Sequence, residues 1–183
     1  MTEGVLIREG SAADADGVAF LHWQGWRTTY GGIMPEALIQ ARPLERRRRE
    51  WRERLGADLE TLWVAEDATG RLVGFLRAEP ARPVPAGEPA CDVEITYLYV
   101  DPAWQGRGVG RRLLAAFGRQ ARAHGRRRVL VIAFKGNPFA GFYAAMGARL
   151  ACEEPFLFEG WAGHDLYFVW DDVEALIRAA ERP

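Results

Sequence analysis

Three glycines at alternate positions, Gly106, Gly108 and Gly110, are suited to bind phosphate groups. Glycine has no Cβ, so the backbone can adopt positive φ and direct several N–H groups at one oxygen-rich ligand. The helix expected to begin here adds a field that favours negative charge, and Arg107 and Arg111 add positive charge. The segment therefore predicts a pyrophosphate-binding turn.

Two better-known phosphate loops do not fit the same residues. The P-loop requires a lysine after its last glycine, and the only lysine in the chain is Lys135. The dinucleotide-binding loop requires Gly-x-Gly-x-x-Gly, whereas residues 106–110 read Gly-x-Gly-x-Gly. Taken alone, the glycines are equally compatible with a plain connection between a strand and a helix.

The elements on either side support the phosphate-binding interpretation. Residues 93–100 are rich in β-branched and aromatic side chains, which predicts a strand, and Pro102 ends it because proline has no N–H. Gly125 is expected to end the following helix in a left-handed conformation. Apolar residues at three- and four-residue spacing form the buried face of that helix: Val109, Leu113, Leu114, Phe117 and Ala121.

A second strand and a second helix follow in the same arrangement. Residues 128–134 form an apolar run that predicts a buried strand. Asn137 and Pro138 end this strand, and Pro138 is expected at the first position of a helix, where proline is tolerated. This helix carries Phe142 and Tyr143 and stops at Gly147.

These two segments resemble the GNAT-type N-acetyltransferase superfamily, whose members transfer an acetyl group from acetyl-CoA to an amine. The superfamily's pyrophosphate signature, Gln/Arg-x-x-Gly-x-Gly/Ala, matches Gln105, Gly108 and Gly110. Its downstream element of an Asn, an Ala, an aromatic-Tyr pair and a Gly matches Asn137, Ala140, Phe142, Tyr143 and Gly147. The chain departs from the commonest form by one residue fewer between Ala140 and Phe142, and by Ala148 where a Phe is usual. The resemblance spans nearly the whole chain and is strongest over residues 94–147.

The resemblance implies one α/β domain over residues 1–183 with three layers. Its sheet would be mixed, mostly antiparallel and six- to seven-stranded, with helices on both faces and splayed central strands. Acetyl-CoA would be the cosubstrate, and no metal is implied. The residues implied to bind acetyl-CoA are Leu98, Tyr99, Val100, Gln105, Gly106, Arg107, Gly108, Val109, Gly110, Arg111, Asn137, Phe142 and Tyr143.

Acetyl transfer to an amine makes three chemical demands. An alkylammonium group, with a pKa near ~10.4, cannot attack a thioester until a base takes its proton. The tetrahedral intermediate needs a hydrogen-bond donor for its oxyanion, and the departing thiolate benefits from an acid. We expect Glu94 to be the base, with its pKa raised by desolvation, and Tyr143 to be the acid. A backbone N–H near Leu98 or Tyr99 would be the donor.

Each of these roles has a structural alternative. Glu94 could be an edge carboxylate paired with an arginine. Tyr143 could simply pack in the core as part of an aromatic-rich helix. Asn137 could cap the helix that begins near Pro138.

The acceptor site is implied by the resemblance. In the superfamily it is built by the first two helices, the loop between the third and fourth strands, and the last strands. The corresponding residues here are Trp26, Tyr30, Glu94 and Tyr97, together with residues 80–89. Aromatic walls suit the cationic amine of a small molecule or a peptide N-terminus. His22, one helical turn before Trp26, is expected in the core.

Composition excludes several other classes of protein. The chain has 183 residues, of which 49% are hydrophobic, enough to fill the core of one domain. Its formal net charge of −1 argues against binding nucleic acid. The arginines at 46–49 are flanked by Glu45, Glu50 and Glu53, as on a solvated helix face. Cys91 and Cys152 are too few for a disulfide framework, which favours a reduced, cytoplasmic protein.

Membrane and metal functions are not expected either. No stretch approaches the ~18 uninterrupted apolar residues of a membrane span, and residues 1–4 do not begin a signal peptide. The three histidines are dispersed, so no metal site is expected. Aromatic residues such as Trp161 are expected to be exposed and to favour a homodimer.

The remaining elements complete an α/β pattern. We expect a strand at 5–8, helices at 14–29 and 35–55, and strands at 61–66 and 72–78 joined by a tight turn. Residues 80–89 contain four prolines and are expected to form an exposed, mobile loop. Strands at 149–153 and 165–170 and a helix at 171–180, capped by Asp171 or Asp172, complete the chain.

Two functions of different classes fit these residues. The first is an N-acetyltransferase that moves the acetyl group from acetyl-CoA to a primary amine of a small molecule or peptide, by direct attack in a ternary complex. The second is a non-catalytic module of the same fold that binds acyl-CoA or a partner.

Overall fold

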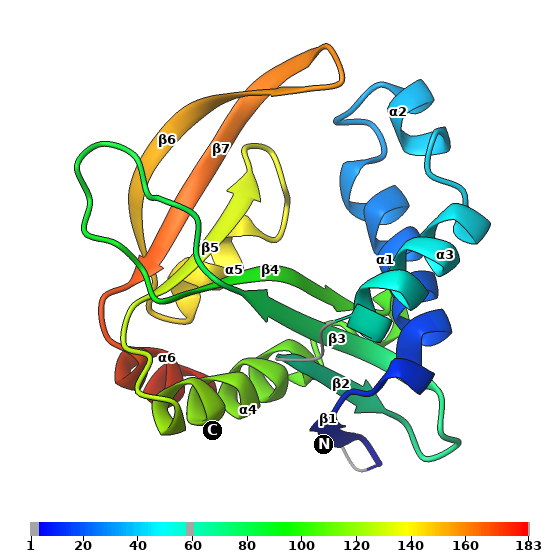
Figure 1. The fold of residues 1–183 in the computed structure, drawn as a ribbon, viewed down its shortest axis with the longest axis horizontal. Helices are drawn as coiled ribbons and strands as arrows, with labels where there is room; N and C mark the ends of the chain where they lie inside the picture. Colours follow the sequence, from blue (N-terminus) through cyan, green and yellow to red (C-terminus); the bar gives the residue numbers. More distant parts are fainter. Residues whose placement is uncertain (1–3, 58–60, 183) are drawn as a thin grey trace. The chain divides into compact units, whose positions relative to one another are not determined.

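The computed structural model describes residues 4–57 and 61–182 (Figure 1). Its strands and helices are, in chain order, β1 (Leu6–Glu9), α1 (Ala15–Tyr30), α2 (Glu36–Gln40), α3 (Leu44–Ala57), β2 (Leu62–Glu66), β3 (Leu72–Glu79), β4 (Val93–Val100), α4 (Val109–Ala123), β5 (Val129–Phe134), α5 (Ala140–Ala145), β6 (Arg149–Phe158), β7 (Trp161–Trp170) and α6 (Val173–Glu181). The expectation about a signal peptide at residues 1–4 falls mainly on residues outside these ranges.

The described strands form a seven-stranded sheet in the order β1-β2-β3-β4-β5-β7-β6. The pairs β1–β2, β2–β3, β5–β7 and β6–β7 are antiparallel, and β4–β5 is parallel. Helices lie on both faces of this open sheet, which confirms the expected mixed α/β architecture. The chain groups into two compact units, residues 1–77 with 97–113 and residues 78–96 with 114–183, so that β3, β4 and α4 each contribute to both.

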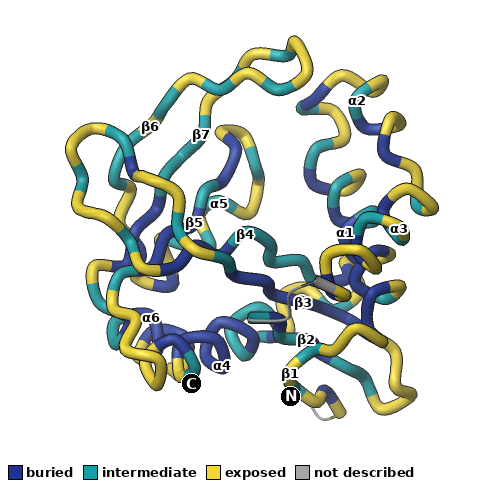
Figure 2. Tube along the Cα trace, in the orientation of Figure 1, coloured by how far each residue is buried: buried dark blue, intermediate teal, exposed yellow. Residues whose placement is uncertain are grey.

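In the first unit, both faces of β3 are covered by helices. Phe75 is fully buried and its ring contacts that of Trp51 on α3 at a centroid distance of 5.4 Å. Its neighbour Gly74 faces the opposite way, and a Cβ there would come within 3.2 Å of Val109 on α4. Because successive strand residues point to opposite faces, β3 packs between α3 and the start of α4. Figure 2 shows β3 as a continuously buried strand.

The expected helix over residues 35–55 is two helices, α2 and α3. The break is at Ala41–Pro43, where the chain turns before α3 begins at Leu44. Proline has no N–H and disfavours helical geometry in the residue before it, so Pro43 ends one helix and permits the next to begin after it.

In the second unit, α4 and α6 lie side by side on one face of the sheet (Figure 1). A Cβ at Gly118 would come within 2.8 Å of both Leu176 and Ile177, so the two helices approach as closely as a glycine allows. Asp172 caps α6 by accepting a hydrogen bond from the Glu174 N–H, which settles the choice between the two expected capping residues.

The strands β6 and β7 are longer than expected. They form a continuous hairpin of ten residues a side that turns at Glu159 and Gly160, both with positive φ. Pro155 is tolerated because β6 is the last strand of the sheet and needs no partner on its outer edge. Gly163, which resembles a loop residue in the sequence, is required because a Cβ there would lie 2.3 Å from the Phe134 ring.

Trp161 is half-buried against the Phe134 ring, at a centroid distance of 4.6 Å. The expectation that Trp161 is an exposed aromatic is therefore wrong.

The proline-rich segment between β3 and β4 is a loop, as expected, but contacts at Arg82, Val84 and Glu88 anchor it. Val84 is buried against Leu130 and Val169 of the sheet. Glu88 forms an ion pair with Arg149 at 2.6 Å. The loop therefore covers the face of this sheet that faces away from α4 and α6.

Three further features concern the described residues as a set. None of their helices is long and apolar enough to cross a membrane. No group of three or more of their His, Cys, Asp or Glu side chains is placed to hold a metal ion. Cys91 and Cys152 are free thiols.

Candidate active site

The glycine-rich turn is held on the first unit by Asp101. This buried residue donates its N–H to the carbonyl of Val73 on β3 at 2.9 Å, and its carboxylate accepts a hydrogen bond from the Ala103 N–H. Arg71 forms an ion pair with the same carboxylate at 3.2 Å. Pro102 begins a short 3-10 turn that ends at Trp104. The end of β4 therefore leads into the turn along a fixed path.

Two of the three glycines have the backbone conformation that the sequence predicts. Gly106 and Gly108 have φ of 69° and 79°, a region that L-residues rarely adopt. Gly110 is different, because it lies in the first turn of α4 with ordinary helical geometry. A Cβ at Gly106 or Gly108 would meet no atom within 4 Å, so backbone conformation rather than crowding requires glycine.

The N–H groups of residues 106–110 are available to a ligand. No backbone hydrogen bond in the described part of the chain uses any of them as donor, whereas the Arg112 N–H already bonds to the Gly108 carbonyl. The segment is exposed or half-buried, except for Val109, whose side chain packs in the core. A row of free N–H groups at the start of a 15-residue helix is suited to bind phosphate oxygens.

The arginines near the turn differ in their roles. Arg107 is exposed and its guanidinium lies 5.4 Å from the centroid of the Trp104 ring. Arg112 donates to the Val5 carbonyl at 2.8 Å and is therefore a structural contact. Gln105, the first residue of the signature, donates its side-chain amide to the Val100 carbonyl at 3.1 Å. This bond joins the end of β4 to the turn.

The parallel pairing of β4 with β5 is short. It runs from Val93 opposite Val129 to Ile95 opposite Val131, whereas β4 continues to Val100. Leu98, Tyr99 and Val100 are half-buried. The Tyr99 ring stacks on Phe75 at 5.8 Å, so its side chain belongs to the core and only its backbone is suited to bind a ligand.

His22 lies in an aromatic cluster of the first unit, as expected for a core residue. It is 3% exposed, and its Nδ1 accepts a hydrogen bond from Trp51 Nε1 at 3.0 Å. Its ring lies 4.9 Å from that of Tyr97. Burial holds the pKa of His22 well below its usual value, and the charges of Arg47 and Arg54 act in the same direction. His22 is therefore neutral.

The candidate acceptor residues of the first unit are associated with arginines. The rings of Trp26 and Tyr30 lie 4.7 Å apart, and the guanidinium of Arg47 lies 5.6 Å from the Trp26 centroid. Tyr97 accepts a hydrogen bond from Arg54 at 2.6 Å. Sequence reasoning missed these arginines as partners of the aromatic residues.

The arginine run at 46–49 is only partly the solvated face that we expected. Arg46 and Arg48 form exposed pairs with Glu50 and Glu45, as predicted. Arg47, in contrast, is only 8% exposed and its side chain is directed toward Trp26. The spacing indicates that Arg47 lies on the buried face of α3, because it precedes the buried Trp51 of the same helix by four residues.

Glu94 is 2% exposed in the second unit, and its carboxylate is paired with Arg82 of the proline-rich loop. Arg82 Nε lies 2.8 Å from Glu94 Oε2, and the Arg82 backbone N–H lies 3.3 Å from the same oxygen. Glu94 is therefore paired with an arginine, which is the alternative to a catalytic role that the sequence offers. It lies in a central strand, however, and not at an edge of the sheet.

Tyr143 makes the packing contacts that we considered as its alternative, whereas Asn137 does not cap α5, whose N-cap residue is Phe139. The Tyr143 ring packs against those of Phe142, Phe168 and Trp170, at centroid distances of 5.7, 5.9 and 6.3 Å. Asn137 Oδ1 accepts a hydrogen bond from the Phe139 N–H at 2.9 Å. The helix α5 begins only at Ala140, so the expected placement of Pro138 within the first helical turn is wrong. These residues lie in the second unit, and their action with the glycine turn stays a prediction.

Two polar residues of β7 were missed by sequence reasoning. Asp165 and Tyr167 are half-buried near Glu94 and Arg82. Burial raises the pKa of Asp165, an effect that Arg82 opposes and the charge of Glu94 reinforces. Burial also raises the pKa of the Tyr167 hydroxyl. Both residues lie within the strand expected over residues 165–170, where their alternation is a signal of a shared face.

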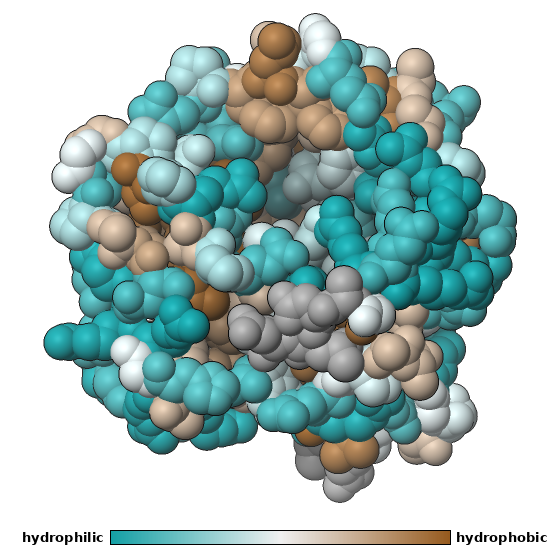
Figure 3. Space-filling model, viewed as in Figure 1, coloured by the Kyte–Doolittle hydropathy of each residue, from teal (hydrophilic) through white to brown (hydrophobic). Residues whose placement is uncertain are grey.

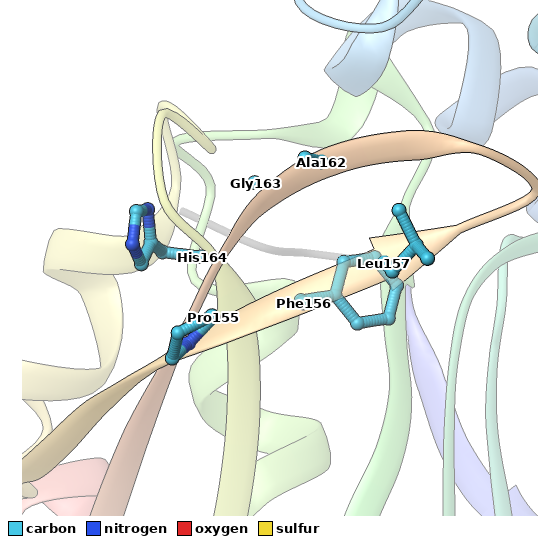
Figure 4. A pocket seen from close by; sticks show the side chains of 6 residues that line it. All are labelled: Pro155, Phe156, Leu157, Ala162, Gly163 and His164. Atoms are coloured by element: carbon cyan, nitrogen blue, oxygen red, sulfur yellow. The ribbon is translucent and has the colours of Figure 1, made fainter.

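A hollow of about 430 Å³ lies at the β6–β7 hairpin (Figure 4). Its lining residues are Pro155, Phe156, Leu157, Ala162, Gly163 and His164. His164 and Asp165 are adjacent in β7 and therefore point to opposite faces, whereas Gly163 and its partner Phe156 share the Asp165 face. The end of the hairpin is hydrophobic at the surface, where Leu157 is 72% exposed (Figure 3).

Comparison with known proteins agrees with the motifs and the fold. A family model described as an acetyltransferase (GNAT) domain matches residues 58–147. The protein of Bacillus subtilis (strain 168) named Uncharacterized N-acetyltransferase YuaI is 29% identical over 172 residues, which cover 94% of this chain and 96% of that protein.

Two solved structures share the fold. The PaiA N-acetyltransferase from Thermoplasma acidophilum, in complex with coenzyme A, has a TM-score of 0.65 at 20% identity, covering 90% of this chain and 97% of its own. YncA from Salmonella typhimurium, with acetyl-CoA, has a TM-score of 0.67 at 19% identity, covering 92% and 94%. The family model that matches across the glycine turn, the relative that spans almost the whole chain and the shared fold all make this chain similar to the GNAT-type N-acetyltransferases.

Proposed function

We propose that this protein transfers an acetyl group from acetyl-CoA to a primary amine of a small molecule or peptide, by direct attack in a ternary complex. The observation that carries the proposal is the row of N–H groups at residues 106–110, free of backbone partners and shaped by positive φ at Gly106 and Gly108. A pyrophosphate offers several anionic oxygens, and N–H groups at a helix start satisfy them at low cost in reorganisation.

The residues of the glycine turn suit coenzyme A in charge as well as in shape. Arg107 is exposed beside the turn and can approach a phosphate. The backbone of residues 98–100 continues beyond the paired part of β4, and its N–H and C=O groups suit the amides of a pantetheine arm. Two structural neighbours were solved with coenzyme A or acetyl-CoA, which supports the same cosubstrate here.

The chemical roles that we propose follow from the demands of the reaction. Glu94 accepts a proton from the acceptor ammonium, so that the free amine can attack the thioester carbon. The N–H of Leu98 or Tyr99 stabilises the oxyanion, and Tyr143 donates a proton to the departing thiolate. In total, the ammonium loses two protons, the thiolate gains one, and one proton is released. Asn137, with Phe142, would contribute to acetyl-CoA binding as in the superfamily.

We also propose that residues 1–183 form a single acetyltransferase domain that works in the cytoplasm. The curated relative matches 94% of the chain, which supports one domain, and the free thiols of Cys91 and Cys152 suit a reducing compartment.

A panel of amines tests the function. The purified protein is mixed with acetyl-CoA and each amine in turn, and free thiol is measured as coenzyme A is released. Thiol release that requires both substrates is the expected result. A non-catalytic module would be thermally stabilised by coenzyme A and would release no thiol with any amine.

A further inference from the structure

Strand register places Glu94, Tyr167 and Asp165 on one face of the sheet in the second unit. Glu94 lies opposite Leu130 of β5, and Leu130 lies opposite Val169 of β7. Residues directly opposite each other in a ladder share a face, and so do residues two apart along a strand. Tyr167 and Asp165 precede Val169 by two and four residues in a ladder without a bulge, so all three polar groups point the same way.

Two of these polar groups are unused. The Asp165 carboxylate and the Tyr167 hydroxyl form no hydrogen bond or ion pair with any residue that the structure describes, although both are half-buried. Because both side chains are half-buried and not fully enclosed, they remain accessible and can offer a carboxylate and a hydroxyl to a ligand.

Within residues 4–57 and 61–182, Arg82 is the cation that influences Asp165, and its contact is replaceable. Its carboxylate partner Glu94 is buried, but the Arg82 side chain is 56% exposed. The Arg82 side chain can leave without moving Val84, which is buried against the sheet, while the Arg82 backbone N–H stays 3.3 Å from Glu94 Oε2. The face therefore holds two carboxylates and one displaceable guanidinium, a charge balance that favours a second cation.

Aromatic rings lie at the Asp165 end of this face. Phe134 lies opposite Asp165, and its ring contacts those of Trp161 at 4.6 Å and Phe156 at 6.3 Å. Aromatic faces beside carboxylates attract an organic cation through both charge and the ring quadrupole. A ligand of matching chemistry carries an ammonium group on an apolar body.

We propose that Asp165, Glu94 and Tyr167 bind the ammonium group of the acetyl acceptor, and that the Arg82 guanidinium occupies this position until the acceptor displaces it. Asp165 is then a specificity-determining residue that selects cationic amines with an apolar or aromatic body. The inference rests on the proposed acetyltransferase function, since it assigns the acceptor class of that enzyme.

Calorimetric titration of the full-length protein with phenethylamine at neutral pH tests the assignment, with phenethyl alcohol as the uncharged analogue. We expect the ammonium to bind more tightly than the alcohol. Asp165→Asn should weaken ammonium binding by about 10- to 100-fold, as for loss of a charge-assisted hydrogen bond, and leave alcohol binding unchanged. Arg82→Gln should strengthen ammonium binding, because it removes the competitor.

The control variant is Glu153→Gln, on the opposite face of the same hairpin, where the carboxylate pairs with Lys135. It should bind phenethylamine as the wild type does. The inference is overturned if the ammonium binds no better than the alcohol, or if Asp165→Asn and Arg82→Gln both leave ammonium binding unchanged. A parallel titration with acetyl-CoA separates the two claims: intact acetyl-CoA binding without ammonium selectivity refutes only the acceptor site, whereas absent acetyl-CoA binding refutes the proposed function.

Kinetics with an accepted amine give a second readout. Asp165→Asn should raise the KM for an alkylamine more than it lowers kcat, with the KM for acetyl-CoA unchanged. A merely structural role would instead lower the melting temperature and alter both KM values together, and that result would contradict the assignment.

Discussion

The Nε atom of Arg82 lies 2.8 Å from Oε2 of Glu94, a carboxylate that is 2% exposed in the middle of the sheet. The pair joins the proline-rich loop to the strand that carries the proposed catalytic base. Because the partner is an exposed side chain of a loop, the pair can open for an incoming cation without unfolding the sheet.

Glu94→Gln should lower kcat by about 10²- to 10⁴-fold, the range typical of a removed general base. Glutamine has nearly the same shape, so the melting temperature and the acetyl-CoA affinity should change little. Steady-state kinetics with thermal unfolding as the control checks this. Undiminished turnover in the variant would remove Glu94 from the mechanism.

Tyr143→Phe separates an acid role from a packing role. The ring contacts with Phe142, Phe168 and Trp170 remain in the variant, so stability should be preserved. If Tyr143 donates a proton to the thiolate, kcat should fall by about 10²-fold. Unchanged kcat with unchanged stability would assign Tyr143 to core packing alone.

Asp14 should make stability depend on pH. Burial by itself would raise its pKa, but hydrogen bonds from Arg8 and from Ser11 outweigh that effect and lower the pKa below its ordinary value of 3.8. A carboxylate with a lowered pKa in the folded state stabilises the protein above pH 3.8, and that stabilisation is lost as the pH falls through the folded-state pKa.

Asp14→Asn should accordingly reduce the free energy of unfolding at pH 7 by about 1–3 kcal/mol. The difference from the wild type should shrink below pH 3.8. Urea unfolding across a pH series measures both. Asp16→Asn is the matched control, because Asp16 forms a surface pair with Arg52, and its effect should be much smaller. An equal effect of the two variants at pH 7 would refute the role of Asp14.

The local parts of the fold were predictable because their signals lie within a few residues. The strand β4, the glycine turn and α4 follow from strand propensity, Pro102, the glycines and the spacing of apolar residues. The left-handed Gly125, with φ of 71°, ends α4 where the sequence placed it.

The parts that could not be predicted depend on contacts between distant residues. Gly163 suits a loop until the Phe134 ring, on another strand, is known to occupy the space of its Cβ. The pairing of Glu94 with Arg82 depends on how the proline-rich loop folds back, which no periodicity encodes. The burial of Arg47 likewise requires the Trp26 ring from another helix.

Calorimetric titration with acetyl-CoA tests the central claim, that the N–H groups of the glycine turn bind a pyrophosphate. We compare the wild type with Gly108→Glu and with Gly125→Glu, since both glycines have positive φ and open space around them, and only Gly108 belongs to the turn. The wild type and Gly125→Glu should bind, and Gly108→Glu should lose more than about 100-fold in affinity, since several charge-assisted hydrogen bonds are lost. No binding to the wild type, or equal affinity in Gly108→Glu, would contradict the account.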